Sequence, residues 1–164
     1  VCGILAGRRL DEVEDHVFKM GSRINSTWGG NLVDMVRFDR ILEIIEEDDL
    51  IGNARTVGAH LMARLHSLAA ESASVSNVRG LGLMCAVDMP TNEFRDRVLQ
   101  RCYDDGIIIL GCGAKSVRFR SPLTITKEEI DKGLDLIRNI ILTVEAEYKP
   151  YRKKAGLTDA LMDG

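Results

Sequence analysis

The stretch Val78-Arg79-Gly80-Leu81-Gly82-Leu83-Met84-Cys85-Ala86-Val87-Asp88 stands between a long helical pattern and Pro90. Its second half is a continuous apolar run, which is typical of a buried strand. The glycines at its start suit a tight turn, and Pro90 is a residue that ends a strand. We therefore predict one strand here, entered through a glycine-rich turn, with Cys85 as a buried thiol.

Helical patterns lie on both sides of this strand. Before it, apolar residues recur at helical spacing over residues 50–70. After it, Thr91 is a suitable N-cap for a second helix of about three turns. Thr126 and Glu129 have the spacing of a capping box, which predicts the start of a last helix over residues 130–144.

Two further strands are expected in the second half of the chain. Residues 107–110 are rich in β-branched side chains and predict a short buried strand. A loop over residues 111–116 leads to a strand over residues 117–120, on which Arg118 and Arg120 share one face because side chains alternate along a strand. With the helices, these strands predict a small α+β layer in which helices cover a sheet.

The first part of the chain follows a different plan. Val1-Cys2-Gly3-Ile4-Leu5-Ala6 resembles a strand from the middle of a sheet, yet no partner strand follows it, so we expect its sheet in sequence outside this chain. A helix of about four turns is predicted from residue 32. We expect three parts, at residues 1–47, 48–148 and 149–164, the last of them a tail.

Composition excludes several classes of function. The chain has 164 residues, a net charge of −3 and a pI near 5.7, which argues against a nucleic-acid or anionic-membrane surface. The four cysteines show no C-x-x-C spacing and the three histidines form no partner pattern, so no metal site is expected. Without a signal peptide or a long apolar span, a reducing cytoplasm is the simplest compartment.

Asn25-Ser26-Thr27-Trp28-Gly29-Gly30-Asn31 places hydroxyls, amides and a glycine pair immediately before the helix that begins near residue 32. Glycines let backbone approach a ligand, and a helix N-terminus offers unpaired N–H groups and a favourable dipole for an anion. A phosphate group is the natural ligand of such a segment. The alternative is a plain N-cap and turn, for which Asn, Ser and Thr suffice without any ligand.

Three segments together resemble the class III, pyridoxal-phosphate-dependent aminotransferases. They are the segment around Thr27 with its following helix, Arg79-Gly80-Leu81-Gly82-Leu83-Met84, and Val117-Arg118-Phe119-Arg120-Ser121-Pro122-Leu123-Thr124-Ile125-Thr126. The resemblance covers roughly residues 1–145 in order. It implies an α/β protein of fold type I, of which this chain forms the C-terminal part: the end of the large cofactor-binding domain and a small α+β C-terminal domain.

The resemblance also implies roles for individual residues. Thr27 and Ser26 resemble the residues that bind the phosphate of pyridoxal phosphate, across the interface of a homodimer with shared active sites. Arg118 resembles the arginine that binds the α-carboxylate of the amino acid or of the 2-oxo acid, Asn25 resembles a residue near the substrate, and Arg120 is expected to support Arg118. No lysine near the start stands in the family's context, so the Schiff-base lysine is expected upstream of Val1 and the isolated chain is expected to be inactive.

Within the family, residues 23–37 are most similar to members that transfer the ε-amino group of L-lysine to 2-oxoglutarate, because Trp28 replaces the phenylalanine of most relatives. Two alternatives stay open at this point. One is an aminotransferase for another ω-amino acid, ornithine or 4-aminobutyrate. The other is a non-catalytic dimerisation or phosphate-binding module.

Overall fold

The computed structural model describes residues 6–20 and 27–154, and the opening strand expected over residues 1–6 falls almost wholly outside them. The chain divides into two compact units between Asp48 and Asp49, and each is described by itself. The first unit contains a short 3-10 helix, η1 (Arg8–Glu12), and the helix α1 (Leu32–Glu47). The helix predicted from residue 32 is thereby confirmed.

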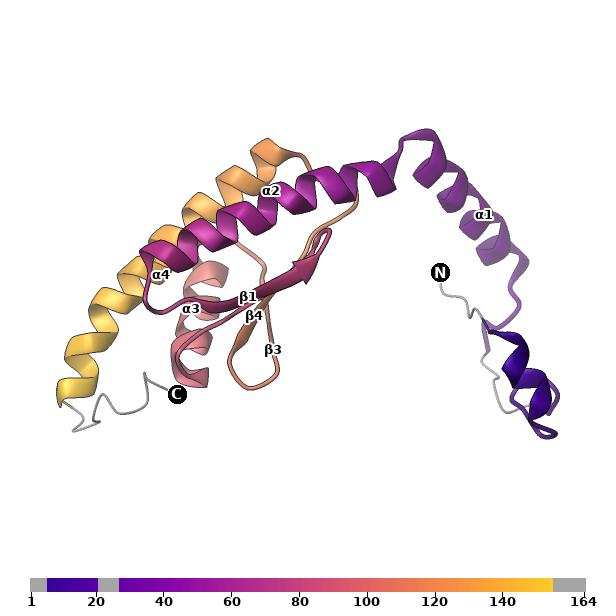
Figure 1. Ribbon diagram of the computed structural model, residues 1–164, viewed down its shortest axis with the longest axis horizontal. Helices are drawn as coiled ribbons and strands as arrows, with labels where there is room; N and C mark the ends of the chain where they lie inside the picture. Colours follow the sequence, from indigo (N-terminus) through magenta and orange to yellow (C-terminus); the bar gives the residue numbers. More distant parts are fainter. Residues whose placement is uncertain (1–5, 21–26, 155–164) are drawn as a thin grey trace. The chain divides into compact units, whose positions relative to one another are not determined.

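Over residues 49–154, the described part of the second unit contains three helices and four strands (Figure 1). In chain order they are α2 (Leu50–Glu71), β1 (Ser76–Leu81), β2 (Met84–Asp88), α3 (Asn92–Asp104), β3 (Leu110–Cys112), β4 (Ser116–Arg120) and α4 (Lys127–Lys154). The strands form one sheet in the order β1-β2-β4-β3, and every neighbouring pair is antiparallel. The predicted small sheet with covering helices is therefore confirmed.

The single strand predicted over residues 78–88 is wrong, because the segment forms the β1–β2 hairpin instead. Leu81 pairs with Met84, so Gly82 and Leu83 make a two-residue turn, and the φ of Gly82 is +56°. This positive φ is costly for residues other than glycine. Gly80 permits a close approach of the two strands, since a Cβ there would stand 2.5 Å from the carbonyl oxygen of Met84.

The strand expected over residues 107–110 is shifted along the chain. The Ile107 N–H donates to the carbonyl of Cys102 at 2.7 Å, which holds residue 107 against the end of α3, and pairing with β4 begins only at Leu110. Ile108 is 86% exposed, so the prediction of a buried strand is wrong there. The predicted helix end at residue 144 is also wrong, because α4 continues to Lys154 and includes the first residues of the expected tail.

Both predicted helix caps are present. Thr91 accepts a hydrogen bond from the Phe94 N–H at the start of α3. Thr126 and Glu129 form the reciprocal bonds of a capping box: the Glu129 N–H donates to the Thr126 hydroxyl at 3.2 Å, and the Thr126 N–H donates to the Glu129 carboxylate at 2.9 Å. These caps fix where two of the covering helices begin. Among the described helices, none has an apolar stretch sufficient to span a bilayer.

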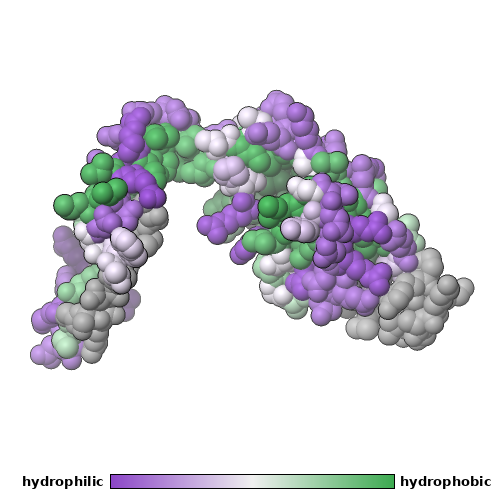
Figure 2. All heavy atoms as spheres, turned by 180° about the vertical axis from the view of Figure 1, so that it is seen from behind, coloured by the Kyte–Doolittle hydropathy of each residue, from purple (hydrophilic) through white to green (hydrophobic). Residues whose placement is uncertain are grey.

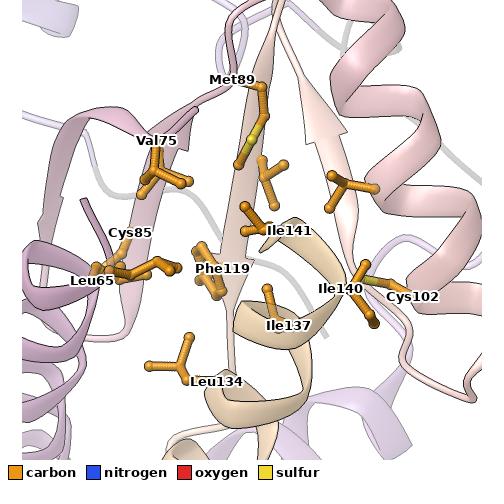
Figure 3. Close-up of a cluster of buried hydrophobic side chains, with 14 of the residues drawn as sticks. Leu65, Val75, Cys85, Met89, Cys102, Phe119, Leu134, Ile137, Ile140 and Ile141 are labelled. Carbon is orange, nitrogen blue, oxygen red and sulfur yellow. The ribbon is translucent and has the colours of Figure 1, made fainter. Parts of the chain in front are cut away.

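The hydrophobic core of the second unit lies between one face of the sheet and the helices (Figure 3). On the sheet side, Cys85, Val87, Val117 and Phe119 are all buried. The opposite face, which we call the open face, follows from the alternation of side chains and from the strand register. It carries Arg79, Leu81, Met84, Ala86, Asp88, Leu110, Cys112, Ser116, Arg118 and Arg120.

Candidate functional site

The predicted phosphate-binding segment is only partly described. Asn25 and Ser26 lie outside the described residues, whereas Thr27 lies in a turn with an exposed side chain. Trp28 is 74% exposed, and Gly30 has a φ of +74°. The turn leads directly into α1, as the sequence predicts.

Asn31, and not Thr27, is the N-cap of α1. Its side-chain oxygen accepts a hydrogen bond from the Val33 N–H at 2.9 Å. The N–H groups of Leu32 and Asp34 have no acceptor within the helix, because the first turn of any α-helix leaves its donors unpaired. The cap that the alternative interpretation requires is thus supplied by Asn31. Thr27 is exposed and takes no part in the cap, so its hydroxyl stays available to an anion at the opening of the helix.

Arg118 lies at the centre of β4 on the open face of the second unit. In the sheet it stands between Ala86 on β2 and Leu110 on β3. The side chain is half-buried, and its Nε atom is buried without a hydrogen-bond partner among the described residues. No carboxylate within residues 6–20 or 27–154 forms an ion pair with Arg118. An unpartnered buried donor on a cation is costly, which is a reason to expect a ligand for it.

A pocket of about 410 Å³ adjoins Arg118. Its lining is mostly apolar and includes Leu61, Phe119, Leu134 and Ile137, which belong to the core side of the sheet, together with Ile107, Pro122 and Ile125. Arg120 also lines it, and this side chain is exposed on the same face as Arg118, as the strand alternation predicts. A guanidinium with an unpartnered donor suits a ligand that carries a carboxylate.

A polar network that the sequence reasoning missed lies beside Arg118 on the open face. Asp88, whose side chain is 13% exposed, accepts from Arg79 Nη1 at 2.9 Å and from Asn77 Nδ2 at 2.8 Å. The Ser116 hydroxyl donates to the same carboxylate and accepts from Arg79 Nη2 at 2.9 Å. Every polar atom of this carboxylate is therefore engaged by neighbouring donors.

The charge of Asp88 is set by this network. Burial by itself raises the pKa of Asp88, but the hydrogen bonds from Ser116, Asn77 and Arg79 outweigh burial, and the net pKa is lowered. The group is consequently ionised at neutral pH and forms a true ion pair with Arg79. The signal that would have found this pair was the hairpin, because a turn at Gly82 brings residues 79 and 88 onto one face of neighbouring strands.

Cys85 and Cys102 are buried free thiols of the core and do not belong to the candidate site. Burial raises the pKa of Cys85, and burial with the nearby charge of Asp105 raises the pKa of Cys102 to about 11. Cys85 is 2% exposed, which confirms the predicted buried thiol. A thiol with a raised pKa is a poor nucleophile, so these two side chains have a packing role.

The family model described as Aminotransferase class-III matches residues 9–141. Among curated proteins, the chain is 50% identical over 145 residues to L-lysine-epsilon aminotransferase of Mycobacterium tuberculosis, covering 88% of this chain and 32% of that protein. It is 46% identical over 146 residues to the L-lysine-epsilon aminotransferase of Streptomyces clavuligerus, with the same coverage of 88% and 32%. It is 32% identical over 128 residues to human mitochondrial 4-aminobutyrate aminotransferase, covering 77% and 25%.

A solved structure of lysine aminotransferase from M. tuberculosis superposes on this chain with a TM-score of 0.77 at 49% sequence identity. The match covers 87% of this chain and 33% of that one. The chain therefore spans about a third of the length of the relatives it matches.

Proposed function

The chain belongs to the class-III aminotransferase family, and from this premise we propose that its full-length protein transfers the ε-amino group of L-lysine to 2-oxoglutarate. The products are 2-aminoadipate semialdehyde and glutamate. The single observation that carries the proposal is Arg118, a half-buried arginine with an unpartnered Nε beside an apolar pocket. The choice of lysine is supported by the contrast between 50% identity to the lysine enzymes and 32% to human 4-aminobutyrate aminotransferase.

Pyridoxal phosphate is the cofactor of class-III aminotransferases, and when bound it supplies the electron sink that carries the amino group between substrates. The described residues fit its phosphate. Thr27 offers an exposed hydroxyl, and the opening of α1 offers N–H groups without helical acceptors. We assign the phosphate to Thr27 and Ser26 and place Asn25 near the substrate, the last two from the family resemblance.

Arg118 has the task of orienting both substrates. A planar guanidinium meets a carboxylate through two parallel N–H···O bonds, which fix direction as well as charge. Lysine and 2-oxoglutarate both carry an α-carboxylate, so one arginine can serve both halves of the exchange. Binding lysine by this end directs the distal amine away from Arg118.

We also propose a homodimer with shared active sites in a reducing cytoplasm. The helix α1 has no buried residue in this structure, and Leu32, Val33 and Val36 are each more than 70% exposed. Figure 2 shows this apolar surface over α1 beside charged side chains. An apolar stripe of this kind is expected to be covered in the assembled protein. The free thiols Cys85, Cys102 and Cys112 suit a reducing compartment.

The test of the function is an assay of the full-length protein with pyridoxal phosphate. Glutamate is expected to form from 2-oxoglutarate with L-lysine as donor, and kcat/KM for lysine should exceed that for ornithine and 4-aminobutyrate by at least about tenfold. Detection of 2-aminoadipate semialdehyde identifies the ε-amine as the transferred group. A higher kcat/KM for either competitor, or glutamate formation without the semialdehyde, would reject the lysine assignment.

Thr27→Ala in the full-length protein is expected to raise the dissociation constant of pyridoxal phosphate by about tenfold or more, because one hydrogen bond to a charged group is lost. Equilibrium dialysis of the cofactor measures this. Thr27→Ser is the matched control, since it keeps the hydroxyl and should bind within about threefold of the wild-type protein. Equal affinities for the Ala and Ser variants would show that the hydroxyl does not contact the phosphate.

A further inference from the structure

Asp88 stands between two arginines that are placed almost symmetrically on the open face. On β2, Ala86 is directly opposite Arg79 of β1 and directly opposite Arg118 of β4. Asp88 lies two residues further along β2 on the same face, so it is a diagonal neighbour of both arginines. Diagonal neighbours on a sheet face are about 7–8 Å apart, which long side chains can bridge.

Only Arg79 forms an ion pair with the Asp88 carboxylate among the described residues. Arg79 Nη1 donates to Asp88 Oδ1 at 2.9 Å, whereas Arg118 makes no ion pair with any described residue. Ala86, the residue of β2 opposite both arginines, has only a methyl side chain. Two further hydrogen bonds hold the Arg79 side chain beside Asp88. Arg79 Nη2 donates to the Ser116 hydroxyl, and Arg79 Nη1 donates to the Asn77 carbonyl.

We propose that Arg79 is a positioning residue, which keeps Arg118 free for the substrate carboxylate by occupying Asp88. The proposal rests on the proposed function, in which Arg118 binds the α-carboxylate. Without Arg79, the Asp88 carboxylate would have the free guanidinium of Arg118 as a diagonal neighbour on the adjacent strand β4. Arg118 would then be paired inside the protein, and an incoming carboxylate would have to displace Asp88 before it could bind.

The argument is one of competition between two carboxylates for one guanidinium. Guanidinium–carboxylate pairs are among the stronger polar contacts in proteins, and Asp88 is held within the sheet, so it competes at a high local concentration. The lowered pKa of Asp88 keeps it charged at neutral pH. A charge on Arg79 therefore affects substrate binding although this side chain need not touch the substrate.

The experiment compares Arg79→Gln, Asp88→Asn and the double variant in the full-length enzyme. The probe is glutarate, which has two carboxylates and no carbonyl group that can react, and its dissociation constant is measured by calorimetry. Arg79→Gln is expected to weaken glutarate binding by about tenfold, because Asp88 then pairs with Arg118. Adding Asp88→Asn should restore binding to within about threefold of wild type, since the competing carboxylate is gone.

Arg79→Lys keeps a cation for Asp88 and is expected to bind glutarate like the wild-type protein, and it covers the case in which Arg79→Gln folds poorly. Arg118→Met should lose glutarate binding, which shows that the probe reports on Arg118. A double variant as weak as Arg79→Gln would overturn the proposal, since Arg79 would then act only by holding the sheet together. Glutarate binding does not depend on turnover. A failure of the lysine assay would therefore reject the proposed function, whereas the order of glutarate dissociation constants among the variants would still test the role of Arg79.

Discussion

Arg118→Met in the full-length enzyme is expected to lower kcat/KM for L-lysine by about two to three orders of magnitude. Two charge-assisted hydrogen bonds to a carboxylate are lost, at about 1.5–2 kcal/mol each, and every 1.4 kcal/mol corresponds to about a tenfold change. Kinetics of the half-reaction, in which the cofactor-loaded enzyme meets lysine without 2-oxoglutarate, measure this loss without contribution from the second substrate.

Arg120→Met is the matched control for this prediction. Arg120 lies on the same strand and the same face, two residues further on, but its side chain is exposed. It is expected to change kcat/KM by less than about fivefold, as is usual for a solvent-exposed charge. Equal losses in the two variants would mean that the open face attracts substrate by its general positive charge, and not through a specific pair with Arg118.

A second control uses the substrate. Pentane-1,5-diamine is lysine without its carboxylate, so its low reactivity in the half-reaction should be the same in the wild-type enzyme and in Arg118→Met. The variant should also be at least as stable as the wild type, because it removes a buried Nε that has no partner in the described structure. A diamine rate that falls in parallel with the lysine rate would show that Arg118 affects the cofactor or the fold.

Elements that depend on local signals could be predicted from the sequence. The helices α1 and α2 follow from the spacing of apolar residues, and the starts of α3 and α4 follow from Thr91 and from the Thr126–Glu129 box, which the structure shows as hydrogen bonds. The placement of Arg118 and Arg120 on one face of a strand followed from alternation alone. In each case the information lies within a few residues of the feature.

Features that depend on pairing between distant segments could not be predicted in this way. A glycine pair before an apolar run fits both a turn at the start of a strand and a hairpin, and only the pairing of Leu81 with Met84 decides between them. Residues 107–109 have strand-like composition but meet the end of α3. The network of Arg79, Asp88 and Ser116 joins three strands, so no single segment of sequence carries its signal.

Phe94→Ala is expected to destabilise the second unit by about 3–5 kcal/mol, the usual cost of removing a buried aromatic side chain. Phe94 is 1% exposed and forms an edge-to-face contact with Tyr148, with ring centroids 5.2 Å apart. It lies in the first turn of α3, so its loss leaves a cavity where α3 meets α4. Urea unfolding followed by far-ultraviolet circular dichroism measures the change in the free energy of unfolding.

Tyr103→Ala is the control on the same helix. Tyr103 is also aromatic but is 70% exposed near the end of α3, and its replacement should change the free energy of unfolding by less than about 1 kcal/mol. The Thr91 hydroxyl, which caps the Phe94 N–H and contacts Tyr148, stays in place in Phe94→Ala, so the helix start is preserved and the measured loss belongs to packing. Equal losses in the free energy of unfolding for Phe94→Ala and Tyr103→Ala would contradict this prediction. The buried contact between α3 and α4 would then not be what stabilises the core.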